Sequence, residues 1–137
     1  MRGKMKDAFY LQTALGVAEH SKCKRMKVGA VLVKKGDIIG TGYNGTPTKF
    51  EPDVCECQKT GETLDYVIHA ELNAILSAAR NGRSTKGSTL YLTLSPCSKC
   101  AALIMQAGIK KVVFLKRYRN TEALTLLSEY GIITTQY

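Results

Sequence analysis

The sequence predicts a single α/β domain in which a central sheet is covered by helices. The chain has 137 residues, of which 45% are hydrophobic, which is enough for one compact core but too little for two domains of ordinary size. A helical pattern and a hairpin pattern come first, and strand-like and helix-like segments then alternate through the second half. We therefore expect one domain over residues 1–137.

The first half is predicted to contain one helix and one β-hairpin. Apolar residues recur at roughly helical spacing over residues 4–20, which indicates an amphipathic helix that packs against a sheet. Two apolar runs follow, residues 28–33 and 38–43, and the polar turn 34–37 separates them. This turn contains a glycine, the residue that adopts positive φ most readily, so the two runs predict a hairpin.

The middle of the chain contains an irregular segment and then a second helix. Residues 44–66 are rich in Gly, Pro, Asp, Cys and Thr and have little periodicity, which is typical of a long loop suited to binding or metal chemistry. From His69 onward good helix formers dominate, and the Asn-Gly pair at 81–82 is expected to end this helix.

The last third is predicted to alternate between strands and helices. Ser95 is the expected N-cap of the third helix, with Pro96 at the first helical position, and Gly108 should follow its last turn. The expected elements are a buried strand over 89–94, a helix over 97–107, a strand over 110–115, a helix over 121–130 closed by a glycine, and a short strand over 132–135.

Three residues form the most informative pattern in the chain. An H-A-E sequence at residues 69–71 and a P-C-S-K-C sequence at residues 96–100 are separated by 24 residues. His69, Cys97 and Cys100 can hold a zinc ion by one imidazole and two thiolates, which leaves the fourth tetrahedral position for water. The two cysteines lie at i, i+3 in the first turn of a helix, so their sulfurs share one face. An open fourth position indicates a catalytic zinc site.

Glu71 is the predicted acid and base of this site, because it lies two residues from His69 without being a ligand. A helix start lowers the pKa of a cysteine, and zinc lowers the pKa of its bound water to ~7 from ~16. Our hypothesis is that Glu71 takes a proton from this water, passes it to the ring nitrogen beside an attacked amidine-like carbon, and then protonates the departing amine. The combined pattern is the signature of zinc-dependent nucleobase deaminases.

Each part of this pattern has another explanation when it is taken alone. A Cys-x-x-Cys pair also fits a structural zinc knuckle or a redox pair, and an isolated histidine on a helix is more often a core residue. Their joint presence favours the catalytic zinc site. Because the chain has an odd count of five cysteines, metal binding explains them better than a disulfide framework does, and a reducing compartment is expected.

The charge distribution leaves the partner open. The net charge is +9, with basic residues in excess at both ends of the chain and acidic residues in excess over 36–85. A basic excess attracts phosphate, but it does not distinguish a nucleotide from nucleic acid or from a solvated surface. No run of 18 apolar residues occurs, and residues 1–6 do not resemble a signal core. We therefore expect a soluble, cytoplasmic protein without a membrane partner.

Four segments closely resemble deoxycytidylate (dCMP) deaminases: residues 27–33, 42–47, 69–75 and 95–110. The G-Y-N-G loop at 42–45 and the Q-A-G-I-K sequence at 106–110 are specific to this family, whereas the zinc motifs are shared across the deaminase superfamily. The resemblance covers roughly residues 15–133. It implies a three-layer α/β/α cytidine deaminase-like fold with a central mixed five-stranded sheet flanked by helices.

The same resemblance implies an activity and its partners. The activity is zinc-dependent hydrolysis of dCMP to dUMP and ammonia, which supplies dUMP for thymidylate synthesis in pyrimidine nucleotide metabolism. Members commonly form homo-oligomers, above all hexamers, and many are activated by dCTP and inhibited by dTTP. We therefore expect a small-molecule nucleotide as the substrate and no nucleic acid partner.

Residues that match the family are expected to bind the substrate. Asn44 matches the asparagine that contacts the sugar, Arg25 matches a basic position near the phosphate, and Ala70 lies between the ligand and the acid. An amide can both donate to and accept from a sugar hydroxyl, and a guanidinium binds phosphate bidentately. A turn residue that tolerates left-handed geometry is the alternative for Asn44, and ordinary solvent exposure is the alternative for Arg25.

A basic and aromatic run follows the predicted strand over 110–115. Ligands gather at the carboxyl ends of strands in open α/β sheets, and family members often carry an aromatic residue here. The resemblance implies that Tyr118 flanks the pyrimidine and that Arg117 or Arg119 meets the phosphate. A solvated basic turn remains the alternative.

The resemblance further implies a second zinc site. Many relatives have a longer insertion before the H-A-E sequence that holds a structural zinc ion together with a cysteine from the N-terminal region. The insertion is shorter here, but four residues remain in corresponding places: Cys23, Cys55, Cys57 and His20. Either Cys23, Cys55 and Cys57 form a structural zinc site with His20 or another group as the fourth ligand, or the three cysteines are free buried thiols.

The G-Y-N-G loop also resembles the regulatory region of the family. Gly42, Tyr43 and Gly45 are therefore the candidate allosteric residues, where dCTP or dTTP would bind. A binding loop alone does not establish a coupling free energy between two sites.

Three other functions compete with dCMP deamination. A tRNA adenosine deaminase shares the zinc residues and has a basic surface for an RNA loop, but the G-Y-N-G loop favours a mononucleotide. A deaminase of free cytidine commonly has a cysteine where His69 stands. A zinc-stabilised binding module would leave Glu71 without a role, and turnover would distinguish it from an enzyme.

Overall fold

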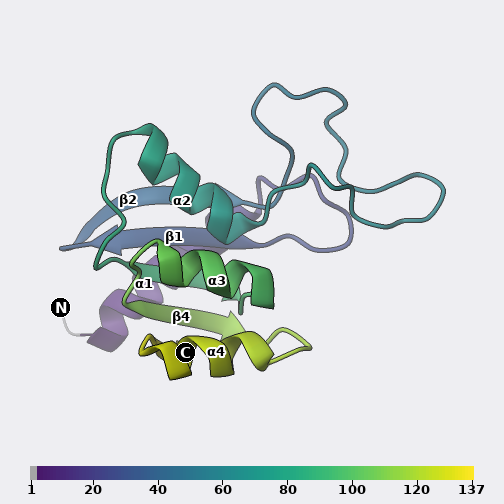
Figure 1. Ribbon diagram of the computed structural model, residues 1–137. Helices are drawn as coiled ribbons and strands as arrows, with labels where there is room; N and C mark the ends of the chain where they lie inside the picture. Colours follow the sequence, from purple (N-terminus) through teal and green to yellow (C-terminus); the bar gives the residue numbers. More distant parts are fainter. Residues whose placement is uncertain (1–2) are drawn as a thin grey trace.

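The computed structural model describes residues 3–137 and has a five-stranded mixed sheet between two layers of helices (Figure 1). The elements in chain order are α1 (Gly3–Ala18), β1 (Gly29–Lys34), β2 (Asp37–Tyr43), α2 (Ala70–Arg80), β3 (Thr89–Leu94), α3 (Ser98–Gln106), β4 (Lys111–Lys116), α4 (Glu122–Tyr130) and β5 (Ile133–Gln136). The predicted α/β/α architecture is therefore confirmed, and each predicted element ends within two residues of the observed one.

The sheet has the strand order β2-β1-β3-β4-β5. Strand β1 is antiparallel to both β2 and β3, whereas β4 is parallel to both β3 and β5. The hairpin between β1 and β2 turns at Lys35 and Gly36, with φ values of 51° and 82°. Two consecutive positive φ values match the right-handed twist of the strands, so the predicted role of the glycine is confirmed.

Helix α1 alone covers one face of the sheet, and it lies behind the strands in Figure 1. Leu11 and Ala14 of this helix are buried against Val31, Tyr91 and Val113 of the three central strands. Complete burial of a leucine side chain stabilises a fold by about 1.5–3 kcal/mol, so this contact supports the predicted packing of the first helix on the sheet.

Helices α2, α3 and α4 cover the other face and enclose the larger core (Figure 1). Leu32, Leu92 and Phe114 point to this side, while their neighbours along the same strands point to α1. This alternation is the two-residue period of a strand whose two faces are both buried. The central strands are therefore rigid supports for the loops that follow them.

The carboxyl ends of the parallel strands β3 and β4 meet at one edge of the sheet. The Ser95 N–H donates to the Lys116 carbonyl at 2.9 Å, and the Ser95 hydroxyl accepts the N–H of Tyr118 at 2.6 Å. The prediction that Ser95 caps the third helix is therefore wrong, because its side chain binds the segment after β4. The N-cap is Cys97, and α3 begins at Ser98.

A long segment without regular helices or strands connects β2 to α2 and extends from one end of the sheet (Figure 1). Isolated bridges between Gly45 and Ile68 and between Glu56 and Thr63 give it internal order. Within the described part of the chain, no helix is both long enough and apolar enough to cross a membrane.

Candidate active site

The three predicted metal ligands converge at the starts of two helices. The Nδ1 atom of His69 lies 3.2 Å from the sulfur of Cys100 and 3.7 Å from the sulfur of Cys97. A tetrahedral zinc ion with bonds of about 2.1 Å to nitrogen and 2.3 Å to sulfur places these atoms about 3.6 Å apart. All three ligand atoms also lie within 4.8 Å of one another. The residues therefore fit a zinc ion without rearrangement.

His69 and Cys97 are the N-cap residues of α2 and α3, and neither side chain makes a capping hydrogen bond. Ser, Thr, Asp or Asn usually occupies this position, and replacing such a cap costs about 1 kcal/mol. The two helices begin without that stabilisation, so the imidazole and the thiol are free to bind a metal ion.

Gly42 fixes the position of α2 relative to the sheet. A Cβ atom at Gly42 would lie 2.4 Å from the carbonyl oxygen of Ala70 and 2.4 Å from the nitrogen of Ala74. Only a glycine allows this approach of helix and strand. In addition, Gly45 and Ile68 exchange backbone hydrogen bonds of 3.1 and 2.8 Å immediately before His69. Strand β2 thus holds the first turn of α2 and its metal ligand in place.

Glu71 lies in the first turn of α2 and is only 5% exposed. Burial raises the pKa of its carboxyl group, while the charge of His69 and a hydrogen bond from the Cys100 thiol act in the opposite direction. A buried carboxyl group that can hold or release a proton next to the metal ligands is suited to acid and base catalysis.

The environment of Cys100 differs from the one predicted. A helix start was expected to lower its pKa, but burial raises the pKa of this thiol, and the neighbouring Glu71 and Cys97 raise it further. Desolvation outweighs the helix dipole because Cys100 is 3% exposed. A divalent cation bound between these groups would favour the thiolate, so the donor set fits a metal ion in its charge as well as in its geometry.

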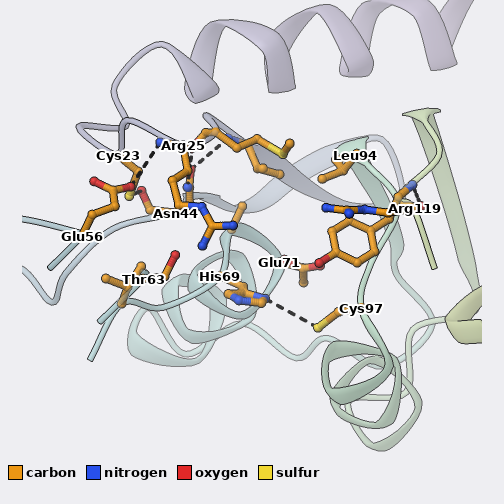
Figure 2. Close-up of a pocket in the computed structure, with 16 residues that line it drawn as sticks. Cys23, Arg25, Asn44, Glu56, Thr63, His69, Glu71, Leu94, Cys97 and Arg119 are labelled. Atoms are coloured by element: carbon orange, nitrogen blue, oxygen red, sulfur yellow. Dashed lines mark hydrogen bonds between the residues drawn. The ribbon is translucent and has the colours of Figure 1, made fainter. Parts of the chain in front are cut away.

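A cavity of about 390 Å³ opens over this cluster (Figure 2). Its walls come from the segment between α1 and β1, the long loop, the start of α2 and the carboxyl ends of β3 and β4. Figure 2 shows Glu71, His69 and Cys97 at one side of the cavity and Glu56 with Thr63 at the other. This volume suits a small-molecule ligand.

Arg25 and Arg119 line the cavity, whereas Arg117 does not. The Nε of Arg117 donates to Gln136 at 2.9 Å, which places its side chain against β5. Among the side chains that the structure describes, those of residues 6–137, the only ion pair joins Lys22 to Asp53, so neither of the two cavity arginines is neutralised by a carboxylate. Of the two arginines predicted after β4, only Arg119 is therefore available to an anion in the cavity.

Tyr118 and Ala70 also line the cavity, at the positions where the sequence predicted substrate contacts. Tyr118 is 40% exposed, and the hydroxyl of Ser95 holds its backbone N–H. Ala70 is fully buried as the first residue of α2. Its side chain is small enough to leave room beside the metal ligands.

Asn44 lines the cavity, but its amide also has an internal role. The oxygen accepts the N–H of Val28 at 2.9 Å, and the nitrogen donates to the carbonyl of Met26 at 2.8 Å. Asn44 is not among the residues with positive φ, so the alternative of a left-handed turn residue does not apply. One N–H and one lone pair remain for a ligand.

Of the four residues predicted for a second zinc site, the structure brings Cys23 and Cys55 together, with Glu56 beside them in place of Cys57 and His20. The structure joins Cys23 and Cys55 in a disulfide bond, with their Cα atoms 5.2 Å apart, and Cys57 is a free thiol outside this pair. The His20 ring instead faces the Tyr43 ring, with a centroid separation of 6.0 Å. Cys23 and Cys55 lie with Glu56 in a group whose potential ligand atoms are all within 4.8 Å of one another, so the same residues could hold a metal ion when their thiols are reduced.

The predicted regulatory residues line a separate cavity of about 720 Å³ between the end of β2, the long loop and α2. Gly42, Tyr43 and Gly45 lie on its wall together with three cationic residues, Lys22, Lys49 and Arg80. Gly42 therefore contacts both the metal-binding helix and this second cavity, and Gly45 is bonded to Ile68 just before that helix.

Sequence reasoning missed several residues of the site. Ser95 could have been found, because a polar residue directly after a buried strand often serves a site at the carboxyl edge of a sheet. Glu56 and Thr63 lie in an irregular segment that has no periodic pattern. Their bridge across the loop depends on tertiary structure, so no local signal indicated it.

Comparisons with known proteins agree with this geometry. The model of the cytidine and deoxycytidylate deaminase zinc-binding region matches residues 4–116. The chain is 40% identical to the deoxycytidylate deaminase of Enterobacteria phage T4, over 83% of this chain and 79% of that protein. It is also 40% identical to the deoxycytidylate deaminase of Homo sapiens, over 85% of this chain and 68% of that protein.

A solved structure is similar over the full length. The dCMP deaminase from the cyanophage S-TIM5, in complex with dCMP and dUMP, superimposes with a TM-score of 0.93 and 41% sequence identity. The alignment covers 100% of this chain and 99% of that one. This chain therefore belongs to the cytidine and deoxycytidylate deaminase family.

Proposed function

We propose that residues 1–137 act as one deaminase domain that hydrolyses dCMP to dUMP and ammonia. The observation that carries this proposal is the combination of the zinc-fitting ligands and Glu71 with Arg25 and Arg119 in one cavity. The similar S-TIM5 protein was solved in complex with dCMP and dUMP, which supports this substrate and product. The two hydrophobic clusters lie on opposite faces of one sheet, which supports a single domain.

His69, Cys97 and Cys100 would hold the zinc ion. When bound, zinc supplies a Lewis acid that makes water nucleophilic at neutral pH. Glu71 takes one proton from the attacking water and delivers it to the ring nitrogen beside the attacked carbon; it then takes the second proton, from the hydroxyl now on that carbon, and gives it to the departing amine. Water replaces the amino group as the ring carbonyl, and ammonia leaves. Because the carboxyl group is buried, bulk water does not compete for the proton.

The walls of the cavity would orient the nucleotide. Arg25 and Arg119 are free of carboxylate partners and can bind the phosphate. The remaining amide capacity of Asn44 suits a sugar hydroxyl, and Tyr118 can flank the pyrimidine. The N–H of Ala70 belongs to the first turn of α2, where backbone donors have no intrahelical partner.

We also propose the use of the product, the oligomeric state, the effector site and the cellular compartment. The product dUMP feeds thymidylate synthesis, and the assembly is a homohexamer. The second cavity is the site where the phosphates of dCTP or dTTP bind; Lys49 and Arg80 on its wall are free of ion pairs, whereas Lys22 is paired with Asp53. The cytoplasm is the proposed compartment. The free thiols of the metal site support a reducing compartment. In such a compartment the disulfide between Cys23 and Cys55 would be converted to two thiols.

The test is ammonia release by the zinc-loaded protein with dCMP and with deoxycytidine at equal concentrations. A strong preference for dCMP is expected, because the two arginines recognise the phosphate. Glu71→Gln is the matched control. It should retain zinc but lose nearly all turnover, since the amide cannot carry a proton. Equal rates with both substrates would contradict phosphate recognition, and an active Glu71→Gln protein would remove Glu71 from the proposed role.

Regulation and assembly have separate measurements. dCTP and dTTP are added to the dCMP assay, and sedimentation with and without each nucleotide measures the oligomer. Activation by dCTP together with a hexameric mass is expected. If Lys49→Ala and Arg80→Ala leave the nucleotide response unchanged, the second cavity is not the effector site.

A further inference from the structure

The segment that carries Arg25 has no regular secondary structure and depends on side chains for its position. It connects α1 to β1 over residues 19–28. Oε2 of Glu56 accepts the N–H of Lys24 at 3.0 Å and the N–H of Arg25 at 3.2 Å. Consecutive backbone N–H groups that converge on one anionic oxygen form a compact anion-binding nest. Here the anion is a side chain of the protein itself.

Glu56 is held at this place by the long loop. The preceding residue, Cys55, is bonded to Cys23, and its carbonyl accepts the N–H of Leu64 at 2.8 Å. Glu56 itself forms a backbone bridge with Thr63. The loop therefore contacts the Arg25 segment through the Cys23–Cys55 bond, the two charge-assisted hydrogen bonds of Glu56 and the ion pair between Lys22 and Asp53.

The carboxylate of Glu56 binds the backbone of Arg25 but not its guanidinium group. Within residues 3–137, no ion pair of 4.0 Å or less joins these two side chains. Both residues line the cavity, and Figure 2 shows Arg25 between Glu56 and the catalytic cluster. Glu56 thus restrains the main chain from which Arg25 extends, and the positive charge of Arg25 stays available.

We propose that Glu56 is a positioning residue that sets Arg25 for the substrate phosphate and thereby determines the preference for a nucleotide over a nucleoside. This inference rests on the proposed dCMP deaminase function. Glu56 lies beside Cys23 and Cys55, across the cavity from His69 and Cys97 (Figure 2), and acts through Arg25, so it influences phosphate recognition and leaves the chemical step unchanged. Its effect is absent for deoxycytidine, which has no phosphate.

The experiment compares kcat and KM for dCMP and deoxycytidine in zinc-loaded wild-type protein and in Glu56→Ala and Glu56→Gln. For dCMP, Glu56→Ala should lower kcat/KM by about 10- to 100-fold, mainly through KM, because Arg25 loses its orientation. Values for deoxycytidine should not change. Glu56→Gln should recover part of the loss, since a neutral amide oxygen can still accept both N–H groups.

Two controls separate positioning from other effects. Glu62→Gln removes the same charge from the same loop, but its side chain has no hydrogen bond to the Arg25 segment among the described contacts, so it should behave as wild type. In an Arg25→Ala background, Glu56→Ala should have no further effect on dCMP. Zinc content and melting temperature are measured for each variant.

The outcomes distinguish this inference from the proposed function. If wild-type protein prefers dCMP but Glu56→Ala binds dCMP as well as or better than wild type, the positioning role is refuted and the function stands. Equal losses for dCMP and deoxycytidine in both Glu56 variants would show a general structural role, which also refutes it. A wild-type protein that deaminates neither compound would overturn both.

Discussion

Replacement of Gly42 by alanine should both destabilise the protein and misplace its metal ligand. The added Cβ would lie 2.4 Å from the Ala70 carbonyl oxygen, whereas real Cβ contacts are essentially never shorter than 3.0 Å. Helix α2 and strand β2 must therefore separate by at least about 0.6 Å at this contact. Overpacking of this kind costs about 1–3 kcal/mol of unfolding free energy. For a chain of 137 residues this lowers the melting temperature by about 3–10 °C.

The same displacement moves His69 and Glu71, because both lie at the start of α2. A misplacement of about 1 Å can cost about 100-fold in rate, so kcat for dCMP should fall by about 10- to 100-fold. Thermal unfolding, zinc content and kcat are measured on the purified variant. Gly16→Ala is the control, because its Cβ would meet nothing within 4 Å in an exposed part of α1. It should stabilise the protein by about 0.5–1 kcal/mol.

A Gly42→Ala protein with wild-type melting temperature and turnover would refute the reasoning. It would mean that α2 can shift on the sheet without disturbing the site. A Gly42→Ala protein that is less stable but fully active would confirm the effect on stability and refute only the inference that displacement of α2 impairs catalysis.

Three further predictions concern recognition, pH dependence and metal content. Arg119→Ala should raise KM for dCMP about tenfold or more, whereas Arg117→Ala should not, because only Arg119 lines the cavity; equal effects would contradict this assignment. Burial and a 2.7 Å hydrogen bond to Asp7 of α1 raise the pKa of the Tyr91 hydroxyl. Tyr91 therefore stabilises the fold below pH ~10, and this stabilisation is lost as the pH rises further. Tyr91→Phe should therefore lower the unfolding free energy by about 1 kcal/mol at pH 8. Denaturant titrations should show that the difference in unfolding free energy between wild type and variant becomes smaller above pH ~10. A difference that does not change with pH would argue against the hydrogen bond. Elemental analysis should find about one zinc ion per chain while Cys23 and Cys55 are bonded, and a value near two would show that these cysteines bind metal instead.

Local patterns predicted most of the architecture and the metal cluster. The strands around Val31 and Leu92 are continuous apolar runs, and such runs are buried on both faces of a sheet wherever they occur. Cys97 and Cys100 share a helical turn, so their geometry follows from spacing alone. His69 was predicted to be a ligand together with Cys97 and Cys100 because the three residues match a known sequence signature, and local spacing alone would not have shown it.

The remaining features depend on which segments meet in space. Sequence alone could not separate Arg117 from Arg119, because the partner of Arg117 is Gln136 in a strand 19 residues away. The pairing of Cys23 with Cys55 and the contact of Glu56 with the Arg25 segment both require the path of the long loop. That path is set by a few tertiary contacts and has no periodic pattern.

Because α2 and α3 lack side-chain caps, the binding of a metal ion is coupled to the order of their first turns. Because His69 and Cys97 are both ligands and N-cap residues, a bound zinc ion would fix the first residue of each of the two helices. The affinity for the ion therefore includes the free energy of ordering two first turns. Removal of the ion would leave the sheet intact but loosen the first turns of α2 and α3. The first turn of α2 contains Glu71. The metal thus governs the rigidity of the very residue that it needs for catalysis.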